Sequence, residues 1–176
     1  MDSQSEQVIL VGHSMGGVVI TQVAEYRPQK IETLVYLTAF LPRNGEFLVM
    51  LAEQDPEAMV MPNLIFADDQ SYITIRDEWI KEAFYGDCSD EDTVRAKTLL
   101  VPQATAPFAT PVNTSEEKFG KVRRIYISCL RDRAITPAAQ EKMYKALPCE
   151  KVIYMDTSHS PFLSAPEKLV NHLVSL

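Results

Sequence analysis

Residues 7–17, QVILVGHSMGG, decide the fold of this 176-residue chain. Residues 7–11 form a short, largely apolar run, which is typical of a strand that is buried on both faces of a parallel sheet. The apolar positions after Gly17 have helical spacing, and Pro28 is expected to end that helix. The segment therefore predicts a strand, a tight turn and a helix in succession.

The turn between these elements has the G-x-S-x-G pattern of serine nucleophiles, in the sequence Gly12-His13-Ser14-Met15-Gly16. We predict that Ser14 is a nucleophile, held on a strained turn at the carboxyl end of the strand. Glycine is expected at positions 12 and 16 because a bulky side chain there would clash with the turn. The backbone N–H of Met15, helped by the helix N-terminus, is expected to stabilise an oxyanion. The alternative is a chance glycine turn that carries a surface serine.

A serine hydroxyl needs a general base, and the chain contains three histidines. His159 follows the apolar segment 151–155, so we predict that it lies at the carboxyl end of a strand, where the sites of parallel sheets are found. His13 is next to Ser14 in the turn, which sets its direction, and His172 falls in the last predicted helix. We therefore predict His159 as the base and retain His13 and His172 as alternatives.

The histidine also needs an acid that fixes its tautomer and orients its ring. Asp132 comes directly after the apolar segment 124–130, again at the carboxyl end of a predicted strand. Asp156 is the rival, although only three residues separate it from His159, which makes the distal ring nitrogen hard to reach. The chain order Ser14, Asp132, His159 is that of the α/β-hydrolases.

The rest of the chain alternates strands with helices. Thr136 as a cap and Pro137 in the first turn predict the start of a helix that runs to about Ala146. Ser164 and Glu167 have the spacing of a capping box for the final helix. This alternation predicts an α/β fold with a parallel sheet flanked by helices. The predicted strands are 7–11, 31–40, 124–130 and 151–155.

Residues 45–118 differ from the rest because prolines are scattered through them and acidic residues cluster. Helices are predicted at about 75–85 and from Ser89, whose hydroxyl can cap the second one. We predict an inserted helical lid over 45–118 and a core formed by 1–44 and 119–176. The large apolar side chains of the lid could bind the substrate, or they could simply pack against one another within the lid. The candidates for substrate binding are Trp79, Phe84, Tyr85, Leu99 and Leu100.

Composition excludes several classes of function. The chain has 24 acidic and 17 basic residues, a net charge of −7, and no basic patch that would bind nucleic acid. It contains no run of about 18 apolar residues that could span a membrane. Cys88, Cys129 and Cys149 have the spacing of neither a disulfide framework nor a zinc site, which favours a reducing, cytoplasmic setting. We expect no metal and no cofactor.

Beyond these motifs, the chain resembles the α/β-hydrolase superfamily and, more narrowly, the plant methylesterase and hydroxynitrile lyase family with its bacterial relatives. The resemblance implies the triad Ser14, Asp132 and His159. Ser160 stands where the lyases carry a lysine, which favours an esterase. The expected reaction is hydrolysis of a small to medium carboxylic ester through an acyl-enzyme, with thioester, lactone and amide substrates left open. The resemblance is carried by VILVGHSMGG (8–17), RPQKIETLVYLTAFLP (27–42), GDCSDEDTVRAKTLLVPQ (86–103), EKFGKVRRIYISCLRDRAITPAAQ (117–140) and DTSHSPFLSAPEKL (156–169).

Members of that family have further strands and a helix before the nucleophile strand, including the loop that gives a second oxyanion N–H. We therefore expect a truncated fold in which segment 7–11 is an apolar edge of the sheet. Because such an edge invites pairing with another chain, we expect a homodimer through it. The alternatives are a monomer whose edge is covered by the N-terminal segment or the lid, and a catalytically impaired relative that binds a ligand or a partner.

Overall fold

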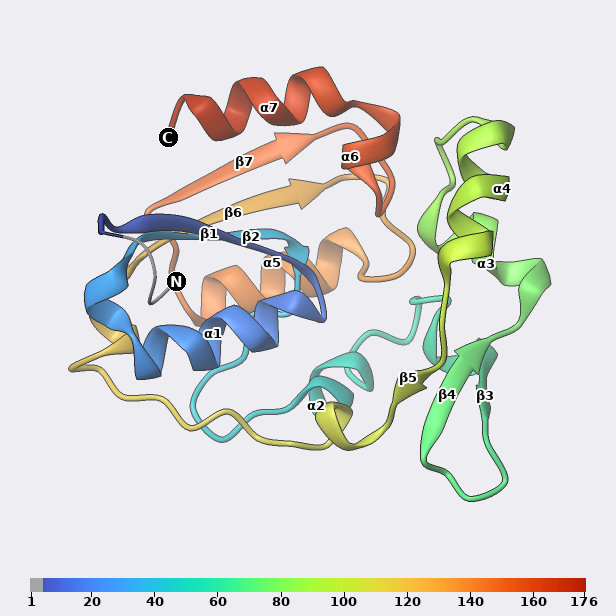
Figure 1. Cartoon of the computed structure of the whole chain (residues 1–176), viewed down its shortest axis with the longest axis horizontal. Coiled ribbons are helices and arrows are strands. Elements are labelled where there is room, and N and C mark those ends of the chain that lie inside the picture. Colours follow the sequence, from blue (N-terminus) through green and yellow to red (C-terminus); the bar gives the residue numbers. More distant parts are fainter. Residues whose placement is uncertain (1–4) are drawn as a thin grey trace.

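The computed structural model describes residues 5–176. Four parallel strands form one sheet, in the order β1-β2-β6-β7 (Figure 1). These strands are β1 (Val8–Ser14), β2 (Ile31–Ala39), β6 (Arg123–Cys129) and β7 (Lys151–Met155). The predicted α/β fold with a parallel sheet is confirmed, and all four predicted strands are present.

Helices cover both faces of this sheet, and the alternation of side chains along β2 explains why. Leu34 and Tyr36 pack with α1 (Gly16–Tyr26) and α5 (Pro137–Ala146) on one face. Val35 and Leu37 point to the other face and share a buried cluster with Leu169 of α7 (Pro166–Val174). Figure 1 shows α1 and α5 below the sheet and α7 above it. Since β2 is apolar on both faces, it lies inside the sheet.

The segment between β2 and β6 contains short helices, as predicted, and also a small antiparallel sheet that was not predicted. This sheet has the order β3-β4-β5 and lies beyond the carboxyl ends of β6 and β7 (Figure 1). Strands of two to four residues are too short to show a clear alternation in the sequence. The elements are α2 (Leu48–Ala52), β3 (Leu64–Phe66), β4 (Tyr72–Ile75), α3 (Asp77–Phe84), α4 (Asp90–Leu99) and β5 (Gln103–Ala104). The remaining elements of the described chain are 3₁₀ helices and one short α-helix: η1 (Pro28–Lys30), η2 (Met61–Asn63), η3 (Ala106–Phe108), η4 (Phe119–Lys121) and α6 (Pro161–Ser164).

Two of the three predicted helix caps are confirmed. The Ser89 hydroxyl accepts a hydrogen bond from Asp92 N (3.0 Å) at the start of α4, and the Thr136 hydroxyl accepts one from Ala139 N (3.3 Å) at the start of α5. The predicted capping box at Ser164 is wrong. Ser164 ends α6 instead, and α7 starts after Ala165. The Ser164 hydroxyl has no hydrogen-bond partner among residues 5–176.

The glycines around the turn differ in what surrounds them. A Cβ at Gly12 would lie 2.7 Å from Gly16 O, so the expected clash there is confirmed. A Cβ at Gly16 would meet nothing within 4 Å, so the expectation of a clash at Gly16 is wrong. Gly17 is instead the second position where a side chain would clash. A Cβ there would lie 2.0 Å from Phe40 O, where α1 crosses the end of β2.

This contrast predicts opposite effects of two neighbouring substitutions. Gly17→Ala is expected to destabilise the chain by about 3 kcal/mol or more, because the new methyl group meets backbone that cannot move without separating α1 from β2. Gly16→Ala, at the first position of α1, is expected to change the free energy of unfolding by less than about 1 kcal/mol. Urea unfolding followed by circular dichroism measures both, and equal effects would contradict the packing described here.

Candidate active site

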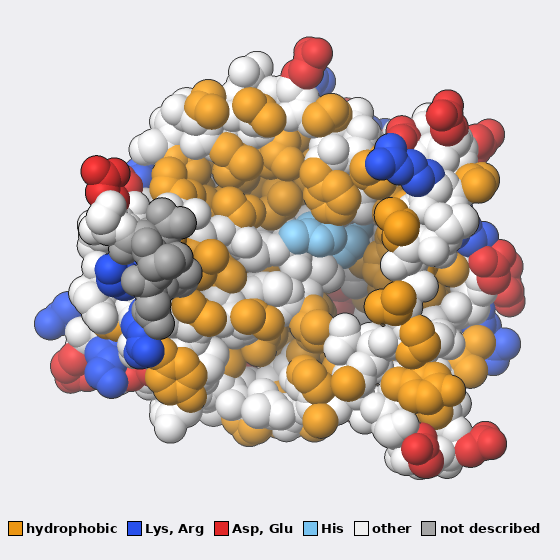
Figure 2. Space-filling model, viewed as in Figure 1, with side chains coloured by type: hydrophobic (Ala, Val, Ile, Leu, Met, Phe, Trp, Pro, Cys, Tyr) orange, Lys and Arg blue, Asp and Glu red, His pale blue; other side chains and the backbone are white. Residues whose placement is uncertain are grey.

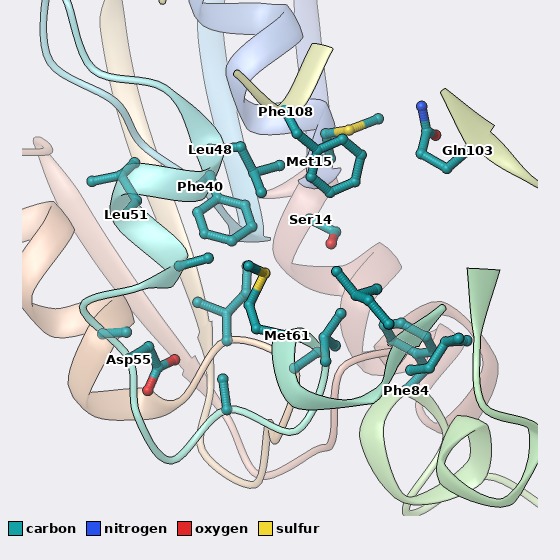
Figure 3. A pocket seen from close by; sticks show the side chains of 18 of the residues that line it. Ser14, Met15, Phe40, Leu48, Leu51, Asp55, Met61, Phe84, Gln103 and Phe108 are labelled. Atoms are coloured by element: carbon teal, nitrogen blue, oxygen red, sulfur yellow. The ribbon is translucent and has the colours of Figure 1, made fainter. Parts of the chain in front are cut away.

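Ser14 lies at the sharp turn between β1 and α1, as predicted. Its φ is +54°, in the left-handed region that non-glycine residues seldom adopt, so the turn is strained. The carbonyl of Ser14 accepts a hydrogen bond from Phe40 N (3.1 Å), which ties the turn to the end of β2. Its side chain lines a cavity and, within residues 5–176, makes no hydrogen bond (Figure 3). The hydroxyl is therefore placed to meet a bound molecule.

Asp132 and His159 are brought together across 27 residues of sequence. His159 Nδ1 donates a hydrogen bond to Asp132 Oδ2 at 2.7 Å, and both residues are 2% exposed. Since a carboxylate can only accept, the proton of the pair lies on Nδ1, and Nε2 is the nitrogen left to accept. The rival acid Asp156 points elsewhere and forms an ion pair with Arg131 (2.9 Å) while remaining 79% exposed.

Asp132 accepts hydrogen bonds from other donors in addition to His159. Its Oδ1 accepts hydrogen bonds from Ala134 N (2.7 Å) and Ile135 N (3.1 Å), in the loop that follows β6. Its Oδ2 accepts a further hydrogen bond from the Thr38 hydroxyl at the end of β2. A buried carboxylate is costly unless donors surround it, and these contacts meet that need. Sequence reasoning did not identify Thr38.

His13 contacts the backbone of the loop that carries His159. Its Nε2 donates to the carbonyl of His159 (2.7 Å), and the two rings are 4.5 Å apart. Removal from water, followed by the nearby charge of His159, lowers the pKa of His13 to about 3. His13 is therefore neutral near pH 7 and holds the backbone of the histidine loop. His172 lies in the last turn of α7 and lines a separate pocket with Arg131.

The cavity at Ser14 has a volume of about 500 Å³ and a mostly apolar lining. Figure 2 shows histidine side chains on this side of the molecule, between apolar groups of the core and of the lid. Of the five predicted lid residues, Phe84, Leu99 and Leu100 line the cavity and Trp79 and Tyr85 do not. Tyr85 is buried in a cluster of the lid itself, and Trp79 lies on α3 just before Ile80, which faces inward. Apolar lining residues that sequence reasoning missed are Phe40, Leu48, Leu51, Met61 and Phe108.

The lid is attached to the loop that carries His159. The carboxylate of Asp87, between α3 and α4, accepts hydrogen bonds from Ser158 N (2.9 Å) and from the Ser158 hydroxyl. Arg131 adds an ion pair to the same carboxylate at 3.2 Å. These bonds fix the lid against the residue that precedes His159.

Residues 5–176 hold no group of three or more side chains suited to binding a metal ion. In the same range, Cys88, Cys129 and Cys149 are free thiols. No helix in the described part of the chain is long and apolar enough to cross a membrane.

Comparisons with known proteins agree with the fold. The family model described as "Alpha/beta hydrolase family" matches residues 2–172. A pyrethroid hydrolase of Sphingobium wenxiniae is 35% identical over 171 residues, which cover 93% of this chain and 61% of that protein. Salicylic acid-binding protein 2 of Nicotiana tabacum is 28% identical, over 99% of this chain and 72% of that protein.

A solved structure extends this agreement to three dimensions. The pyrethroid hydrolase of Sphingobium faniae superposes with a TM-score of 0.86 at 29% identity, over 99% of this chain and 72% of that one. The chain spans 61% of the length of the Sphingobium wenxiniae enzyme and 41% of putative methylesterase 15 of Arabidopsis thaliana. The expected resemblance to methylesterases and their bacterial relatives is confirmed. This chain belongs to the alpha/beta hydrolase family.

Proposed function

We propose that this chain is a serine hydrolase that cleaves small to medium carboxylic esters. The observation that carries the proposal is the buried Asp132–His159 pair, joined at 2.7 Å, in a chain whose Ser14 lines the cavity from a strained turn. Ser14, Asp132 and His159 follow the nucleophile-acid-histidine order of the family, and the three together have no evident structural use. Similar proteins named as a pyrethroid hydrolase and as methylesterases support an ester as the substrate.

The proposed reaction passes through an acyl-enzyme. His159 Nε2 takes the proton of the Ser14 hydroxyl while Ser14 Oγ attacks the ester carbonyl carbon. The N–H of Met15, at the start of α1 where amides lack helical acceptors, stabilises the oxyanion. His159 then gives its proton to the leaving alcohol, and the C–O bond of the ester breaks. Water, activated by the same nitrogen, releases the acid and restores Ser14, while Asp132 remains ionised.

The lining of the cavity supports an apolar group on the substrate. Phe84, Leu99 and Leu100 face the cavity from the lid, and Met15 and Phe108 lie near Ser14 (Figure 3). A volume of about 500 Å³ accommodates an acyl or alcohol portion of drug-like size. We therefore place the apolar part of the ester against the lid.

The test compares the chain with its Ser14→Ala variant on p-nitrophenyl acetate and p-nitrophenyl butyrate. Turnover by the chain and its loss in the variant are the expected results, because the variant lacks the attacking oxygen. Equal rates for the two proteins would defeat the assignment and favour the alternative of a ligand-binding relative without catalysis.

We also propose that two copies associate along β1. In the described range β1 pairs only with β2, and Ile9 and Val11 on its open edge are each 40% exposed. Apolar side chains are prominent around this edge in Figure 2. Open apolar edges pair with other strands, and a charged residue prevents this. Light scattering should give the mass of two copies for the chain and one for Ile9→Lys, and a monomeric chain would contradict the proposal.

A further inference from the structure

Thr38 has an unusual backbone conformation at the end of β2. Its φ is +37°, and a positive φ in a β-branched residue is a genuine outlier. It is also skipped in the pairing of β1 with β2, since His13 pairs with Leu37 and Ser14 pairs with Ala39. Thr38 is thus a bulge of one residue beside the nucleophile turn. Strained conformations and bulges of this kind concentrate at functional sites, where they re-aim a side chain.

The side chain that this bulge re-aims points at the triad acid. Thr38 is fully buried, and its hydroxyl donates a hydrogen bond to Asp132 Oδ2. The same oxygen accepts the bond from His159 Nδ1. The only other donor to this oxygen in the described range is Gln140 Nε2, at the long distance of 3.5 Å. Apart from His159, Thr38 is therefore the main side-chain donor to this oxygen among the described residues.

We infer that Thr38 is a positioning residue for the proposed triad, whose bulge holds a hydroxyl on Asp132 and so fixes the carboxylate that orients His159. The inference rests on the proposed function, because it assigns a role within the same site. A residue that served only to fill space could be apolar, with no need for a strained backbone. Two independent features, the backbone conformation and the hydrogen bond, point to the same carboxylate.

The experiment uses Thr38→Val, which removes the hydroxyl but keeps the branched shape, and Thr38→Ser, which keeps the hydroxyl. With p-nitrophenyl butyrate, the valine variant is expected to lose about tenfold in kcat with KM within about twofold. The serine variant should recover kcat to within about threefold, because it restores the hydroxyl that donates to Asp132.

Thermal unfolding by circular dichroism verifies that the variants fold, and Thr38→Ala replaces the valine variant if that one does not. An unchanged kcat in the variant without a hydroxyl would overturn the inference. An equal loss of kcat in the valine and serine variants would overturn it as well. Failure of the proposed function is distinguished by Ser14→Ala, because hydrolysis by the unmodified chain would then be absent or would be equal to that of the Ser14→Ala variant, whichever residue stands at position 38.

Discussion

The His159→Gln variant is expected to lose at least about 10⁴-fold in kcat toward p-nitrophenyl butyrate. Glutamine can still occupy the space beside Asp132, but it cannot take the proton of the Ser14 hydroxyl or return one to the leaving alcohol. Because the proton transfers occur in the transition state, the loss should appear in kcat, with KM changed by less than about threefold.

His172→Gln is the matched control for this prediction. His172 lies in the last turn of α7, outside the cavity at Ser14, so the variant should retain a kcat within about twofold of the unmodified chain. Stopped-flow or steady-state absorbance of p-nitrophenolate measures both proteins. Similar losses in the two variants, or none in His159→Gln, would show that the base is another group.

The Asp132→Asn variant is expected to lose about 10⁴-fold in kcat with little change in the overall fold. The amide oxygen can still accept from Ala134 N and Ile135 N, which then places the amide NH₂ where Oδ2 stood. That NH₂ faces His159 Nδ1–H, so two donors meet and the histidine adopts the other tautomer. Its Nε2 then carries the proton and cannot act as a base.

Asp156→Asn separates this effect from a general loss of negative charge near the histidine loop. Asp156 is 79% exposed and paired with Arg131, so its variant should keep kcat within about threefold. The comparison uses the same ester and pH for both variants, with circular dichroism to verify folding. A larger loss in Asp156→Asn than in Asp132→Asn would reassign the acid.

Local patterns place Ser14 and Asp132 at the ends of predicted strands, and the structure has Ser14 at the end of β1 and Asp132 just after β6. Ser14 is marked by glycines and by a strand and a helix on the expected sides, and Asp132 directly follows the end of an apolar run. The boundary of the first strand is less accurate, because β1 continues to Ser14 where the sequence predicted an end at Val11. His13 and Ser14 extend the strand because they pair with β2. The sequence does not show this pairing, because Gly12 interrupts the apolar run and suggests that the strand ends there.

The parts that the sequence does not reveal depend on contacts between distant segments. Thr38 and Asp132 are 94 residues apart, and nothing around Thr38 in the sequence signals a left-handed conformation. The close approach of Gly17 to Phe40 is likewise invisible until α1 is packed on β2. The small sheet of the lid consists of strands too short to show a period. Local pattern therefore places the candidate residues at the strand ends, whereas the residues that hold them in position emerge only from packing.

A fluorophosphonate probe followed by intact-protein mass spectrometry tests whether the Ser14 hydroxyl is an activated nucleophile. We expect one adduct per chain, located by peptide mapping to the segment that contains Ser14, and no adduct on Ser14→Ala. An unlabelled chain, or equal labelling of the chain and its Ser14→Ala variant, would show that Ser14 is not an activated nucleophile.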